Sequence, residues 1–111
     1  MLYKFKSKAA GDVIMLQPNG EHVLQIIGKH SADEPSVKGI LLPEQMAQAL
    51  DALSAAIAHE EAARRDAIAA AQAEHLPAPR FDAIGLRQRA QPLMEMIRLC
   101  QKEEEPITWG V

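Results

Sequence analysis

Cysteine is almost absent from this chain of 111 residues, which contains only Cys100. A single thiol cannot form a disulfide within the chain, and no cysteine pair exists as a ligand set for structural zinc or an iron–sulfur cluster. No two of the four histidines have the four-residue spacing that would place both imidazoles on one helical face. We therefore expect no metal, no cofactor and a reducing, cytoplasmic location.

Aromatic residues and positive charge are also scarce. Aromatics make up 4% of the chain, and 12 Lys and Arg residues face 15 Asp and Glu residues. Nucleic-acid modules usually carry a basic surface, and single-strand binders add aromatic stacking platforms. The sequence has neither a signal-peptide apolar stretch nor a run of about 18 apolar residues. Nucleic acid and membrane are therefore excluded as expected partners.

The segment 2–7 alternates apolar and basic side chains with a period of two. This alternation predicts a half-buried strand with Tyr3 and Phe5 on one face and Lys4 and Lys6 on the other. Exposed lysines discourage pairing between sheet edges, and they are also potential partners for an anion. Both interpretations of the lysines stay open at this point.

The apolar run 13–16 is followed by Pro-Asn-Gly, for which two structures compete. Turn chemistry at this tripeptide favours a hairpin from 13–16 to 22–27. Apolar residues at helical spacing, with Gly28 placed to terminate the helix, favour a helix over 18–27. We favour the helix, and we expect a short buried strand at 37–41.

Two amphipathic helices are predicted in the second half, because apolar residues recur every three or four positions. The first begins at Pro43, and the second has Asp82 as its expected N-cap. The apolar stripes consist of Met46, Leu50, Leu53 and Ile57 in the first helix and of Leu86, Ala90, Leu93, Ile97 and Cys100 in the second. We expect an antiparallel helix pair with Cys100 in the core.

The alanine-rich segment between the stripes has helical propensity without an apolar face. Two pairs four residues apart, Glu60 with Arg64 and Glu61 with Arg65, are typical of a helix surface. We expect the packed helix to end near Arg65 and residues 66–82 to form a mobile arm or connector. Whether the alanine-rich segment is one helix or frays stays open.

Alternating apolar residues from Ile107 through Trp109 to Val111 predict a last strand. The chain length fits one domain over residues 1–111, with too little interior for a large enclosed active site. We predict a small α+β fold of order β-α-β-α-α-β. Its two long antiparallel helices pack on a small sheet formed by the N-terminal strand, a central short strand and the C-terminal strand.

The second long helix has a wider apolar surface than one helix pair requires, because Met94, Met96 and Leu99 lie beside its stripe. Trp109 is either a core side chain or an interface anchor. The leading hypothesis is therefore a non-enzymatic protein-interaction module, a homodimer or a domain that binds another protein. No nucleophile, paired carboxylates or phosphate loop indicates catalysis, although a site assembled between subunits keeps an enzyme open.

Arg87 and Arg89 lie near the start of the second long helix, where positive charge opposes the helix dipole. A carboxylate of the neighbouring helix or a bound anion would compensate for this cost. The alternative hypothesis is thus a binding domain for a small anionic metabolite, with Arg87 and Arg89 as its main contacts and Lys4 and Lys6 as further charge partners.

Several segments, taken in order, resemble one bacterial family. They are Met1-Leu2-Tyr3-Lys4-Phe5-Lys6-Ser7-Lys8, Gly11-Asp12-Val13-Ile14-Met15, Leu86-Arg87-Gln88-Arg89-Ala90 with Pro92-Leu93 and Glu95-Met96, and Pro106-Ile107-Thr108-Trp109-Gly110-Val111. Together they resemble the family catalogued as domain of unknown function 1840 over nearly the whole chain, with no motif to compare between Asp66 and Asp82. The resemblance implies a stand-alone cytoplasmic bacterial protein, and it transfers no activity, cofactor or catalytic residue.

Overall fold

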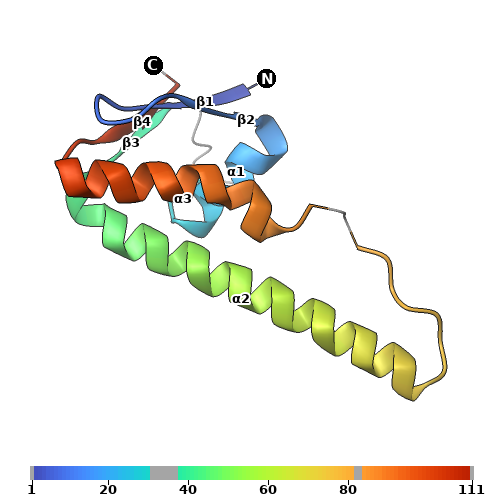
Figure 1. The fold of residues 1–111 in the computed structure, drawn as a ribbon. Coiled ribbons are helices and arrows are strands. Elements are labelled where there is room, and N and C mark those ends of the chain that lie inside the picture. Colours follow the sequence, from blue (N-terminus) through green and yellow to red (C-terminus); the bar gives the residue numbers. More distant parts are fainter. Residues whose placement is uncertain (1, 31–37, 82–83, 111) are drawn as a thin grey trace.

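The computed structural model describes residues 2–30, 38–81 and 84–110, and helices cover one face of a four-stranded sheet in it (Figure 1). The elements are β1 (Leu2–Lys6), β2 (Val13–Leu16), α1 (Gln17–Ile26), β3 (Gly39–Leu41), α2 (Pro43–Ala73), α3 (Leu86–Glu103) and β4 (Ile107–Trp109). The strand order is β2-β1-β4-β3, with every neighbouring pair antiparallel. The predicted α+β class and element order are confirmed, with β2 as an additional strand.

Strand β1 has the predicted alternation, with Tyr3 and Phe5 buried and Lys4 and Lys6 exposed. It pairs with β2 on one side and with β4 on the other. β1 is therefore an inner strand, and the interpretation of its lysines as edge protection is wrong. The edges of the sheet are β2 and β3.

The helix predicted after the apolar run is confirmed as α1. The competing hairpin is wrong, because β2 pairs with the preceding strand, β1, and the residues after β2 are helical. Gly28 follows α1 with a φ of +81°, a conformation that glycine adopts without strain, and the N–H of Lys29 donates to the carbonyl of Leu24 at 2.8 Å. The central strand is seen as β3, while Val37, where we expected it to begin, lies outside the described residues.

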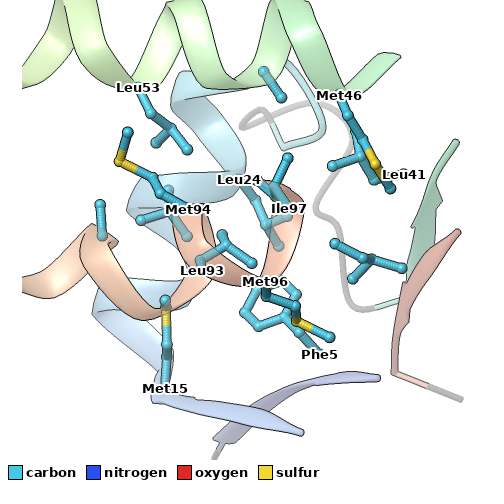
Figure 2. Close-up of a cluster of buried hydrophobic side chains, with 14 of the residues drawn as sticks. Phe5, Met15, Leu24, Leu41, Met46, Leu53, Leu93, Met94, Met96 and Ile97 are labelled. Carbon is cyan, nitrogen blue, oxygen red and sulfur yellow. The ribbon is translucent and has the colours of Figure 1, made fainter. Parts of the chain in front are cut away.

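The core lies between the sheet, α3 and α2 (Figure 2). α3 packs against the sheet on one side and against α2 on the other. α2 and α3 run antiparallel to each other (Figure 1). Trp109 and Phe5 form the part of the core next to the sheet, and their ring centroids are 5.8 Å apart. Each fully buried large apolar side chain contributes about 1.5–3 kcal/mol relative to exposure.

α2 is one unbroken helix of 31 residues. Its last buried residue is Ile57, so its second half projects from the body and gives the molecule a length of 52 Å (Figure 1). Cys100 is buried, as expected. The N-cap of α3 is Gly85, and Asp82, our expected cap, lies outside the described residues. Within the part of the chain that the structure describes, no helix is long and apolar enough to cross a membrane.

Candidate functional site

Arg87 lies on the first turn of α3, facing α2. Its Nε and Nη2 atoms donate to the two carboxylate oxygens of Glu61 at 2.9 and 2.8 Å, a bidentate pair. The carboxylate of Glu61, on the neighbouring helix, thus compensates the positive charge of Arg87 near the start of α3. The expected pair of Glu61 with Arg65 is replaced by this one, and Arg65 instead lies 3.7 Å from Asp66.

Glu60 joins α2 to the first turn of α3. Its Oε1 accepts a hydrogen bond from the backbone N–H of Leu86 at 2.9 Å and lies 3.4 Å from Arg64, as the four-residue spacing predicts. Its Oε2 lies 3.7 Å from Arg89. A Cβ atom on Gly85 would lie 3.1 Å from Oε1, so glycine leaves room for the carboxylate to approach. α3 therefore takes its N-terminal cap from another helix.

The electrostatics of this cluster follow from the bidentate pair. The hydrogen bond from Arg87 holds the pKa of Glu61 below its ordinary value, and the same bond raises the pKa of Arg87. A hollow of about 590 Å³ opens beside the pair, lined by residues that include Glu60, Arg65 and Ile68. Its wall contains both carboxylates, from Glu60 and Glu61, and guanidinium groups, from Arg64, Arg65 and Arg87. This arrangement offers an incoming anion little net positive charge.

Lys4 and Lys6 are separated from the arginines. Both lie on the face of the sheet opposite the helices, because Tyr3 and Phe5 occupy the helix-facing positions of β1. Lys6 lines a different hollow, of about 490 Å³. The structure therefore does not bring the four basic residues together, and an anion site would have to use the two arginines alone.

The residues expected at an interface divide into two groups. Met94, Met96 and Trp109 are buried within the chain, where Met94 faces α2 and Met96 faces Phe5 (Figure 2). Leu99 is the one residue of this set on the surface, at 43% exposure. Because α3 lies between the sheet and α2, its broad apolar surface is buried against both.

The sequence did not predict a group of exposed apolar side chains on the face of the sheet that no described element covers. Leu2 of β1 lies directly opposite Leu16 of β2, and Ile14 lies opposite Lys4. Leu2, Ile14 and Leu16 are 56%, 54% and 69% exposed, and we call these three residues the outer-face patch. The only signal in the sequence was the continuous apolar run of β2. Successive side chains of a strand point to opposite faces, so a strand that is apolar at every position exposes apolar side chains when only one of its faces is covered.

The fold and its surfaces define a small α+β domain in which α1 and α3 lie against one face of an antiparallel sheet and α2 packs on α3. No described element covers the other face of the sheet. The family model described as domain of unknown function (DUF1840) matches residues 1–109. The chain belongs to this family. No curated protein and no solved structure matched it in the same comparisons.

Proposed function

We propose that this protein is a non-enzymatic interaction module that associates with a second copy of itself through the β2 side of its sheet, where the outer-face patch lies. The observation that carries this proposal is the outer-face patch, in which Leu2 and Leu16 form a cross-strand pair that no element covers in the described residues. Contiguous exposed apolar side chains commonly mark protein interfaces. Ile40, 42% exposed, lies on the same face but on β3, at the opposite edge of the sheet from the patch.

We also place the protein in the bacterial cytoplasm. Its only cysteine, Cys100, is fully buried and free, which suits a reducing compartment. The family resemblance supports a bacterial source.

A native mass spectrum of the untagged protein over a concentration series tests the proposal. We expect a dimer at micromolar concentration that dissociates on dilution, with no retained small molecule. A monomer at every concentration, together with no protein trapped by crosslinking in the expressing cells, would contradict the proposal.

Binding of a small anionic metabolite at Arg87 and Arg89 is the second candidate. The observation in its favour is Arg89, whose Nε atom is buried and has no hydrogen-bond partner among the described residues. The carboxylates of Glu60 and Glu61 compete with any anion for these guanidinium groups. A thermal shift of the wild type with phosphate or a dicarboxylate, lost in Arg89→Ala, would support this candidate, and equal shifts in both proteins would contradict it.

A further inference from the structure

Strand β2 is a sheet edge without the features that usually prevent edge pairing. Such features are charged side chains, proline, bulges or a very short strand. β2 consists of Val13, Ile14, Met15 and Leu16, with no charge and no proline. The other edge strand, β3, has three residues and follows Lys38, whereas β2 has four residues and follows Asp12. β2 is therefore the longer of the two edges, with four apolar side chains in succession.

We infer that β2 pairs antiparallel with β2 of a second copy, so that two sheets join into one of eight strands. This inference rests on the proposed self-association and specifies its geometry. In an antiparallel pair, directly opposite residues point to the same face of the sheet. A register centred on Met15 places Ile14 opposite Leu16 of the second copy and keeps the helices of both copies on one side.

This register is self-complementary in its apolar side chains. Met15 points into the core, whereas Ile14 and Leu16 point to the open face. The pairing would place the two outer-face patches side by side, giving six neighbouring apolar side chains. An isologous contact of this kind closes after two copies and leaves no further β2 edge for a third.

The register is also compatible with the charges on the open face. Lys4 lies opposite Ile14 on β1, one strand away from the new contact. In the joined sheet the two Lys4 residues would be separated by three strand spacings, about 14 Å. This separation exceeds the Debye length of about 8 Å at physiological ionic strength, so their repulsion is largely screened. A neutral strand that matches itself favours a second copy over a charged peptide as the occupant.

Sedimentation velocity of Ile14→Lys beside Ile40→Lys tests the inference. The two isoleucines are similarly exposed, on opposite edge strands of the same face. We expect Ile14→Lys to raise the dimer dissociation constant by at least about tenfold, because two apolar cross-strand pairs are lost per interface. We expect Ile40→Lys to leave it unchanged. Thermal melts establish that both variants fold.

Amide hydrogen exchange gives a second measurement that does not depend on a variant. We expect the amides of β2 in the wild type to exchange more slowly at concentrations where the dimer forms. A dimer that Ile14→Lys weakens, but in which the β2 amides gain no protection, would overturn edge pairing and leave self-association at the outer-face patch standing. A dimer that keeps its affinity in Ile14→Lys would overturn both. A chain that stays monomeric would overturn both.

A crosslinking pair tests the register. Directly opposite residues have Cα atoms about 4.5–5.5 Å apart, which suits a disulfide. We expect a mixture of Ile14→Cys and Leu16→Cys proteins to form the mixed disulfide dimer under mild oxidation, while Ile40→Cys with Leu16→Cys does not. Cys100 can be retained because it is buried. Equal yields from the two mixtures would contradict the register.

Discussion

Glu60 of α2 accepts a hydrogen bond from the backbone N–H of Leu86, the first residue of α3, at 2.9 Å. The backbone N–H groups at the start of a helix need acceptors, and side chains of the N-cap residue usually provide them. Here the N-cap is Gly85, which has no side chain. A carboxylate from the neighbouring helix supplies the acceptor and joins the two helices.

Replacement of Glu60 by alanine is therefore expected to destabilise the protein. The variant leaves the N–H of Leu86 without its acceptor and removes the carboxylate beside Arg89, for a cost of about 1–2 kcal/mol. Urea unfolding of Glu60→Ala measures this cost. Asp51→Ala, an exposed acidic position on the same helix, is the matched control. Equal losses in the two variants would contradict the capping role.

The Glu61 and Arg87 pair predicts a pH dependence of stability. The hydrogen bond from Arg87 lowers the folded-state pKa of Glu61 below its ordinary value of 4.5. A carboxyl group with a lowered pKa stabilises the fold above the unfolded-state value, and this stabilisation is lost as pH falls through the folded-state value.

Glu61→Gln tests this dependence. The wild type is expected to be more stable than the variant above pH of about 4.5, with the difference disappearing at more acidic pH. Denaturant unfolding at several pH values measures the difference. Because the pair is exposed, salt is expected to reduce it as well. A difference that does not change with pH would show that the carboxylate charge has no part in it.

Gly20→Ala is expected to destabilise the fold although alanine favours helices. A Cβ atom at Gly20 of α1 would lie 2.5–2.8 Å from ring and Cβ atoms of Tyr3, which is buried under the helix. Overpacking costs about 1–3 kcal/mol, whereas the helix propensity of alanine returns about 1 kcal/mol or less. Gly11→Ala, with no atom within 4 Å of the new Cβ, is the control in the same thermal melts. A Gly20→Ala variant as stable as the wild type would contradict this packing.

The two halves of α2 are expected to differ in their contribution to stability. Ile57 is buried, while Ile68 is 38% exposed on the projecting half. Ile57→Ala is expected to cost about 2–4 kcal/mol and Ile68→Ala less than about 0.5 kcal/mol. Urea unfolding compares them. Similar costs in the two variants would contradict this prediction, because they would mean that Ile68 is packed within the chain as well as Ile57 is.

The predicted mobility of the arm, residues 66–82, is tested by amide hydrogen exchange. We expect protection along α2 to fall beyond Arg65, because no buried side chain holds that part of the helix. Uniform protection as far as Ala73 would contradict a mobile arm.

Periodicity predicted the helices well because their burial depends on local spacing. The stripe from Leu86 to Cys100 is buried as expected. Met94 and Met96 were assigned to an interface because a helix pair buries one stripe, whereas α3 is covered by α2 and by the sheet. The topology of the fold decides which elements lie on the two sides of a helix. The spacing of apolar residues along one helix does not reveal that topology.

Strand pairing was harder to predict for a related reason. The contact between Leu2 and Leu16 depends on the register of β1 with β2, which the connection between them sets. The run of β2 is apolar at every position, so alternation does not reveal its faces. The arginine site was predicted in part. Carboxylate partners were expected, but the choice of Arg87 over Arg65 for Glu61 depends on the alignment of the two helices.

The central claim is that the sheet binds a second copy at the outer-face patch, on its β2 side. The most direct measurement is sedimentation equilibrium of the double variant Leu2→Ser with Leu16→Ser, beside Leu99→Ser on the exposed surface of α3. The account predicts that the double variant is a folded monomer at concentrations where the wild type and Leu99→Ser are dimers. A double variant that dimerises as tightly as the wild type would contradict it.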